Sequence, residues 1–240
     1  MNLVFYSLVG SHNYNLNTKN SDKDYKYFVM PTFDDLYYNK YIHKEFVSKD
    51  IDYTVHDIRK LPVLFYKSNI NFLEVLFSID SNCELKFNDF YKWLIINREK
   101  LATMNLQYLY KACIGMYFTK RKQMINDSDG RHLSIEKYGY DTKSACHSYR
   151  VLDFLIRMYQ NDFCFGDSIY YDDCEKQRNL LIRIKSGEYN LYYINEMLNK
   201  LKENVDSLES YFVSQNSNVC LYEELQDRVK NIVMNFLLDK

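Results

Sequence analysis

The first thirty residues constrain the fold most, because they contain two strand-like apolar runs joined by one polar loop. The run Leu3–Val9 is apolar enough to form a strand buried on both faces. Gly10 and Ser11 follow it directly, and a second run, Asp22–Met30, ends at Pro31. Proline cannot donate to a sheet ladder, so the second strand is expected to end there. The sequence therefore predicts two early strands, with a turn element at the end of the first.

Two acidic residues, Asp22 and Asp24, begin the second run with one residue between them. Residues i and i+2 of a strand point to the same face, so these carboxylates lie side by side while Lys23 points away. Like charges held this close are unfavourable unless a cation lies between them. Carboxylate oxygens are hard ligands that suit Mg²⁺, with Mn²⁺ as the alternative ion. The pattern predicts a divalent-metal site at the start of this strand.

The Gly10-Ser11 pair at the end of the first strand has the features of a phosphate-binding turn. Glycine allows a positive φ and a close approach of a ligand to the backbone. Serine contributes a hydroxyl and an N–H group, and both hydrogen bond to phosphate oxygens. Gly10 and Ser11 are therefore predicted to hold nucleotide phosphates.

A third carboxylate is predicted from the strand 51–56, whose residues alternate between apolar and polar. Asp52 lies on the polar face of this strand, together with Thr54 and His56. A site for two metal ions about 4 Å apart needs roughly three carboxylates, and Asp52 is the candidate for the third. Asp57 competes with it, but it directly precedes a helical pattern and fits a helix N-cap better. The sequence thus predicts a trio of metal ligands, Asp22, Asp24 and Asp52.

Composition sets the limits for the rest of the chain. The 240 residues are 47% hydrophobic and 26% charged, which is typical of a globular protein and excludes a disordered chain. The net charge of -1 gives no overall attraction to nucleic acid, so any polyanion site must be a local patch. No apolar stretch is long enough to span a membrane, and no signal peptide begins the sequence. The six cysteines lack metal-binding spacing and predict reduced thiols in a cytoplasmic protein.

The second half of the sequence has helical periodicity throughout, from about residue 88 to residue 240. A helix capped by Asp141 or Thr142 is expected to run to about residue 159. Lys143, His147 and Arg150 stand at i, i+4 and i+7 of this helix and share one face. Cations on one helical face bind a polyphosphate or an RNA backbone, although many charged faces are simply solvated. These three residues are the predicted nucleotide-binding cations.

Several of these motifs together resemble one family. Gly-Ser followed by Ser-Asp-x-Asp resembles the signature of the DNA polymerase β-like nucleotidyltransferase superfamily. One bacterial and phage family within it is similar over most of the chain, from residue 10 to about residue 190. That similarity lies in the Arg59-Lys60 pair, residues 69–77, the Gly-Tyr-Asp-x-Lys-x-x-x-His-x-x-Arg run from Gly139 to Arg150, and Ile184-Lys185-Ser186-Gly187-Glu188. The chain departs from the family at Ile70, where a proline is usual, and at Lys185, where an arginine is usual.

The resemblance implies an α+β fold with a small mixed, palm-like sheet and flanking helices. Residues 1–87 would be the nucleotidyltransferase domain, and residues 88–240 a helical domain that closes the active-site cleft. The implied enzyme transfers a nucleoside monophosphate from ATP or another NTP to an acceptor hydroxyl, with two Mg²⁺ ions held by the three aspartates. The acceptor stays open between an RNA or tRNA 3′ end, a protein and a small molecule. The alternative function is a non-catalytic nucleotide- or RNA-binding module that retains the fold.

Overall fold

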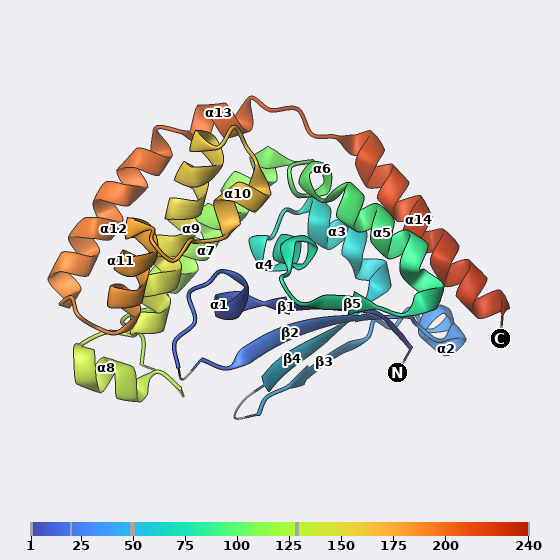
Figure 1. Cartoon of the computed structure of the whole chain (residues 1–240), viewed down its shortest axis with the longest axis horizontal. Coiled ribbons are helices and arrows are strands. Elements are labelled where there is room, and N and C mark those ends of the chain that lie inside the picture. The colour runs from blue at the N-terminus through green and yellow to red at the C-terminus, as the bar shows by residue number, and fades with distance from the viewer. Residues whose placement is uncertain (1, 20, 49–50, 128–129, 240) are drawn as a thin grey trace. The chain divides into compact units, whose positions relative to one another are not determined.

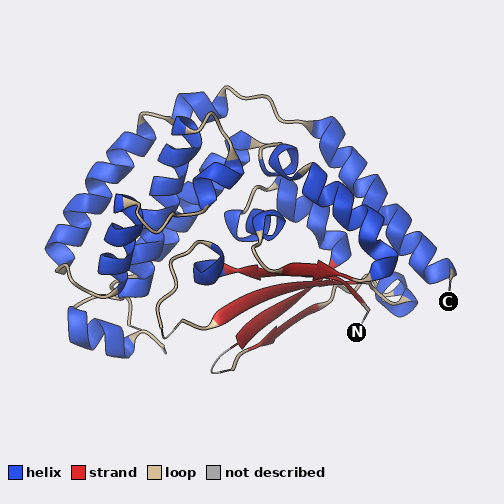
Figure 2. Cartoon of the chain, viewed as in Figure 1, coloured by secondary structure: helices blue, strands red, loops and turns tan. Residues whose placement is uncertain are grey.

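The computed structural model describes residues 2–19, 21–48, 51–127 and 130–239 (Figure 1). The chain divides into two compact units. Unit 1 comprises Met1–Asn105 and Ser217–Lys240, and unit 2 comprises Leu106–Asn216. Unit 1 contains the sheet, and the described secondary structure of unit 2 is helical (Figure 2). The predicted fold class, a small mixed sheet with flanking helices and then a helical region, is confirmed.

The sheet of unit 1 has the strand order β3-β4-β2-β1-β5. Its strands are β1 (Leu3–Val9), β2 (Lys23–Val29), β3 (His43–Phe46), β4 (Ile51–Asp57) and β5 (Ser81–Cys83). The strands β2 and β4 are parallel, and the other neighbours are antiparallel. The three strands predicted at Leu3–Val9, Asp22–Met30 and residues 51–56 are confirmed as β1, β2 and β4.

The two faces of the sheet differ because side chains alternate along each strand. Ser7 and Lys26 are register partners, and the Ser7 hydroxyl donates to the Val75 carbonyl oxygen at 3.1 Å. That face is therefore the one covered by helices of unit 1, as Figure 1 shows. The opposite face carries a row of aromatic rings, among them the stacked pair Tyr6 and Tyr27 with ring centroids 5.3 Å apart. One face of the sheet is thus packed against helices, and on the opposite face aromatic side chains of neighbouring strands pack against each other.

Short helical elements follow the strands of unit 1. They are α1 (Gly10–Asn13), α2 (Phe33–Tyr37), η1 (Ile58–Lys60), α3 (Leu61–Tyr66), α4 (Ile70–Leu73), η2 (Glu74–Phe77), η3 (Leu85–Phe87), α5 (Asn88–Ile96) and α6 (Arg98–Ala102). Asp57 caps η1, accepting a hydrogen bond from the Arg59 N–H at 3.0 Å, so its predicted role as a cap is confirmed. Asp57 is fully buried and also forms an ion pair with the Arg59 guanidinium at 2.6 Å.

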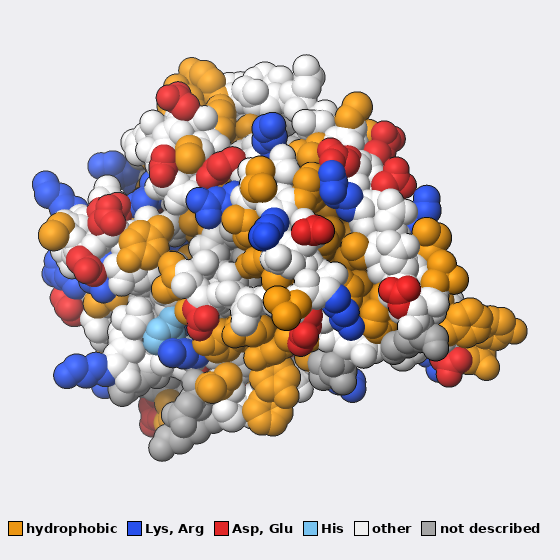
Figure 3. Space-filling model, turned by 45° about the vertical axis from the view of Figure 1, so that its right-hand side comes forward, with side chains coloured by type: hydrophobic (Ala, Val, Ile, Leu, Met, Phe, Trp, Pro, Cys, Tyr) orange, Lys and Arg blue, Asp and Glu red, His pale blue; other side chains and the backbone are white. Residues whose placement is uncertain are grey.

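The last helix, α14 (Val219–Leu238), belongs to unit 1. It packs against α3, where the rings of Tyr66 and Tyr222 have centroids 4.4 Å apart. The Arg228 guanidinium lies over the Trp93 ring of α5 at 4.2 Å. An apolar groove of about 790 Å³ is bordered by α2, α3 and α14, and hydrophobic side chains reach the surface in the view of Figure 3. The helices α5, α6 and α14 therefore belong to the same compact unit as the sheet.

Unit 2 is organised around α9 (Thr142–Gln160), which Asp141 caps by accepting from the Ser144 N–H at 3.0 Å. The other helices of unit 2 are α7 (Leu106–Gln123), α8 (His132–Tyr138), α10 (Phe165–Ile169), α11 (Lys176–Lys185), α12 (Leu191–Asp206) and α13 (Glu209–Val213). Of these, α7, α10, α11 and α12 pack against α9. Apolar residues of α9 such as Leu152 and Leu155 are fully buried, so this helix forms the centre of the unit 2 core. No described helix of the chain is both long and apolar enough to cross a membrane.

Candidate metal centre

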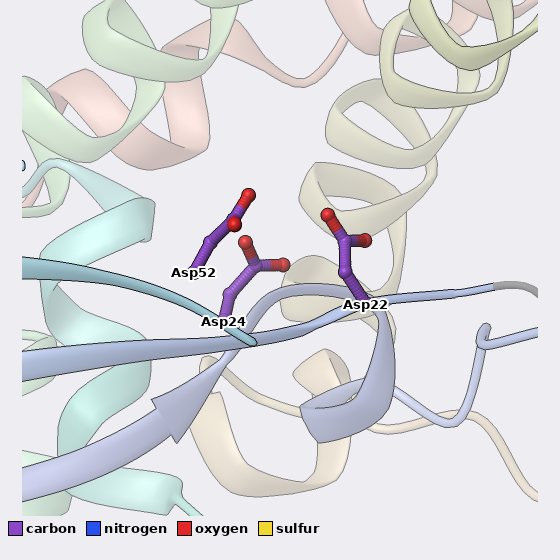
Figure 4. Close-up of side chains that lie close together, drawn as sticks. All are labelled: Asp22, Asp24 and Asp52. Carbon is purple, nitrogen blue, oxygen red and sulfur yellow. The ribbon is translucent and has the colours of Figure 1, made fainter. Parts of the chain in front are cut away.

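Three carboxylates gather at one end of the sheet in unit 1. Asp22, Asp24 and Asp52 each offer an oxygen, and these oxygens all lie within 4.8 Å of one another. All three residues are half-buried, and their side chains rise from the same side of the strands (Figure 4). The sequence predicted that one face would collect these three residues, and the structure brings them together.

The register of two parallel strands creates this arrangement. Asp24 of β2 pairs with Asp52 of β4, so the two side chains leave neighbouring strands at the same level. Asp22 lies two residues before Asp24, just outside β2, on the extended segment that leads into the strand. The His12 Nε2 atom lies 3.1 Å from the Ser21 carbonyl oxygen and ties this segment to the end of α1. One Asp52 oxygen accepts from the Ser48 N–H at 2.9 Å, which orients that carboxylate.

The donor set fits a hard divalent cation. Three carboxylates this close repel one another, and the repulsion is relieved when a cation binds between them. Carboxylate oxygens without sulfur or imidazole ligands favour Mg²⁺ or Mn²⁺ over zinc or copper. Two such ions about 4 Å apart can be bridged by shared carboxylates. The trio therefore has the ligand chemistry of a site for hard divalent cations.

Gly10 lies against this centre and cannot be replaced without moving it. Its φ is +72°, in the left-handed region that favours glycine. A β-carbon at this position would stand 2.5 Å from the Asp24 Oδ2 atom, well inside van der Waals contact. The absence of a side chain at Gly10 therefore leaves room for the Asp24 carboxylate.

The backbone N–H of Gly10 is held by a residue of the helical layer. It donates to the Glu74 Oε2 atom at 2.9 Å, and Glu74 is 2% exposed. The other Glu74 oxygen lies 3.9 Å from the Lys26 Nζ atom, and Lys26 follows Asp24 by two residues on the same face of β2. The Gly10 N–H is therefore hydrogen-bonded within the protein. The sequence did not predict these contacts of Glu74 with Gly10 and Lys26.

His56 lies on the same strand face as Asp52, four residues further along β4. Its Nε2 atom is 3.0 Å from the Thr54 hydroxyl oxygen. Burial, with smaller contributions from Lys26 and His43, lowers the pKa of His56 to about 4. His56 is therefore neutral near pH 7 and adds no positive charge beside the carboxylates.

The predicted nucleotide-binding cations lie on α9 of unit 2. Lys143 is exposed and Arg150 is 3% exposed. His147 is half-buried, and its buried Nδ1 atom has no hydrogen-bond partner among the described residues. Burial, and then the charges of Arg150, Lys120, Lys143 and Lys185, hold the pKa of His147 well below its usual range. The sequence predicted Lys143, His147 and Arg150 as a group. It did not identify Lys120 or Lys185 as their neighbours.

Comparison with known proteins agrees with this geometry. A comparison with curated proteins finds no match. A family model, described as the RNA repair pathway DNA polymerase beta family, matches residues 1–157. The match spans the whole sheet, the three aspartates and α9 as far as Arg157. The chain therefore belongs to the RNA repair pathway DNA polymerase beta family, RlaP.

Proposed function

We propose that this protein is a Mg²⁺-dependent nucleotidyltransferase that transfers a nucleoside monophosphate from an NTP to a hydroxyl group. The observation that carries the proposal is the convergence of Asp22, Asp24 and Asp52 beside the Gly10-Ser11 turn. Nucleotidyltransferases of this superfamily typically use divalent metal ions, and the trio has the ligand chemistry that such ions need. In the reaction the acceptor oxygen bonds to the α-phosphorus, the bond to the β-phosphate oxygen breaks, and pyrophosphate leaves. The hydroxyl proton passes to a base or to water.

Each residue then has a defined task. Asp22 and Asp24 would hold both ions, and Asp52 would complete the ion that lies beside the acceptor hydroxyl. When bound, the ions neutralise the charge that develops on the phosphates. Ser11 would hydrogen bond to the β- and γ-phosphates through its hydroxyl and N–H groups. Gly10 would serve this site by its missing side chain, and Glu74 by fixing the turn.

We propose RNA as the acceptor. The family description names an RNA repair pathway, and a 2′- or 3′-hydroxyl at an RNA end is a nucleophile of the required kind. The cations of α9, Lys143, His147 and Arg150, would bind the phosphates of the nucleotide or of the RNA.

The test measures transfer of an α-³²P-labelled nucleotide to RNA. Purified protein is incubated with Mg²⁺, each of the four labelled NTPs, and RNA that has either a free or a blocked 3′ end. Labelled RNA that depends on Mg²⁺ and on a free hydroxyl is expected, and Asp22→Asn combined with Asp24→Asn abolishes it. Asp89→Asn, which changes an exposed acid of unit 1, is the matched control and retains full activity. Transfer that survives the double substitution refutes the mechanism, and nucleotide binding without any transfer indicates a non-catalytic module.

A further inference from the structure

A cluster of cationic side chains in unit 2 comes from four separate segments of the chain. Its members, called here the cation cluster, are Lys120 of α7, Arg131 before α8, Lys143 and Arg150 of α9, and Lys185 at the end of α11, with His147 among them. The packing of α7 and α11 against α9 brings these segments together. Two contacts fix that packing close to the cluster: Asp141 N–H to the Met124 carbonyl oxygen at 2.8 Å, and Cys146 Sγ to the Leu181 carbonyl oxygen at 3.5 Å.

The members of the cation cluster repel one another. Burial lowers the pKa of Lys120, and the charges of Arg131, Lys143 and Arg150 lower it further, with Asp141 as the opposing carboxylate. The Lys120 ammonium donates to the neutral Gln123 amide oxygen at 3.0 Å. Asp141 itself already accepts the Ser144 N–H as the cap of α9. Three of the four charged groups that act on Lys120 are therefore cationic, which favours an anion beside it.

A solvated helix face does not explain this arrangement, because one central member, Arg150, is buried and another, His147, has a buried ring nitrogen. Arg150 is 3% exposed. His147 is half-buried, and its buried Nδ1 atom lacks a hydrogen-bond partner among the described residues. A buried polar atom without a partner destabilises the folded protein, so such atoms usually have a ligand or solvent to bind. The unsatisfied nitrogen and the surrounding positive charges both indicate an anionic ligand.

We propose that the cation cluster is a binding pocket for a multiply charged phosphate group, with Lys120, Lys143 and Arg150 as its charged contacts and His147 as a neutral one. The phosphate can come from the triphosphate of an NTP or from a phosphorylated RNA end, since both present the same oxygens. Lysine and arginine supply strong charge-assisted hydrogen bonds to such oxygens. The use of this pocket during transfer rests on the proposed function, whereas anion binding does not require it.

The first experiment measures binding by calorimetry in EDTA, so that the metal centre does not contribute. Inorganic tripolyphosphate, ATP, and an RNA oligonucleotide with either a 5′-phosphate or a 5′-hydroxyl are compared at the same ionic strength. Wild-type protein is expected to bind tripolyphosphate, and Lys143→Ala to weaken this binding by about tenfold or more. Lys122→Ala removes an exposed lysine of α7 outside the cluster and leaves the affinity unchanged. Equal losses in both variants, or no binding by wild type, overturn the proposal.

The comparison of the two RNA oligonucleotides identifies the source of the phosphate. Binding of tripolyphosphate and ATP, without a preference between the two oligonucleotides, assigns the pocket to the nucleotide. A preference for the phosphorylated oligonucleotide assigns it to the RNA end.

A second variant tests the repulsion between the positive charges of the cation cluster. Lys120→Met keeps the aliphatic stem but removes the charge, so the ligand-free protein is expected to melt at a higher temperature. The same variant is expected to lose most of the thermal shift that tripolyphosphate causes in wild type. A residue with only a packing role would not give this combination, and a lower melting temperature with retained anion binding contradicts the proposal.

The two proposals fail separately. Asp22→Asn combined with Asp24→Asn is expected to abolish nucleotide transfer and to leave tripolyphosphate binding in EDTA intact. Transfer that fails in wild type while anion binding persists removes the enzymatic function only. Transfer that persists without tripolyphosphate or phosphorylated-RNA binding removes the pocket only.

Discussion

Asp24 and Asp52 are register partners on the parallel strands β2 and β4, and both direct a carboxylate to the same face of the sheet. Their spacing is therefore set by backbone hydrogen bonds between the strands and not by a flexible loop. Two acids held this way repel each other in the folded protein and do so less in the unfolded chain. The sheet thus holds the two carboxylates in place for a cation.

Removing one of these carboxylates should lower the transfer activity without lowering the stability of the metal-free protein. Asp52→Asn is expected to reduce nucleotide transfer by about 100-fold or more, because it removes a charge that positions a metal ion. Without metal the melting temperature should not fall, since repulsion within the trio is relieved. Calorimetric melting in EDTA and in Mg²⁺ checks this expectation. A large loss of stability in EDTA would show that Asp52 has a structural role instead.

Gly10→Ala should damage the site by two separate effects. The left-handed φ costs an alanine about 1–2 kcal/mol, and the new methyl group would displace the Asp24 carboxylate. Gly139→Ala is the matched control, because Gly139 also has a positive φ but no atom lies within 4 Å of the added carbon. Urea unfolding should show a larger loss for Gly10→Ala than for Gly139→Ala, and only Gly10→Ala should lose transfer activity. Equal effects on both measurements would refute the contact with Asp24.

Glu74 should act as a positioning residue for the Gly10 turn. Glu74→Ala leaves the Gly10 N–H and the Lys26 ammonium without their acceptor, at a cost of about 1–3 kcal/mol in the free energy of unfolding. Glu74→Gln retains an oxygen for the Gly10 N–H and should recover part of both stability and transfer. Chemical denaturation and initial rates at several NTP concentrations check this order. Identical behaviour of the two variants would show that the hydrogen bond to Gly10 contributes neither to stability nor to transfer activity.

His56 should make unfolding depend on pH. Its pKa is about 4 in the folded protein and near 6.5 in the unfolded chain, so below pH 6.5 the unfolded chain binds the proton first. The resulting stability is complete above pH 6.5 and is lost as the pH falls to about 4. Because His56 is partly exposed, we expect a loss of about 1–2 kcal/mol. Urea unfolding at pH 7 and pH 5 should show a smaller difference for His56→Gln than for wild type, and His132→Gln, at an exposed histidine, should leave the difference unchanged.

Local patterns were sufficient to predict much of unit 1. Strand alternation placed Asp22, Asp24 and Asp52 on one face, and the pattern after Asp57 identified it as a cap. Long-range contacts carry no such signal. The Gly10 N–H meets the Glu74 carboxylate across 64 positions of sequence, and no periodicity relates those two residues. The packing of α14 within unit 1 has no local signal either, since an amphipathic helix shows which face is apolar but not which partner covers it.

The sequence by itself determined the chemistry of this protein: which side chains are acidic, which faces of strands and helices they occupy, and where glycine permits a turn. Only the tertiary structure decided the distances that make this chemistry usable. It paired β2 with β4 in parallel, placed Glu74 beneath the Gly10 turn, and brought Lys120 and Lys185 to the helix that carries His147. The physical reason is that side-chain direction follows from local backbone geometry, whereas register and helix packing depend on burial of the whole core.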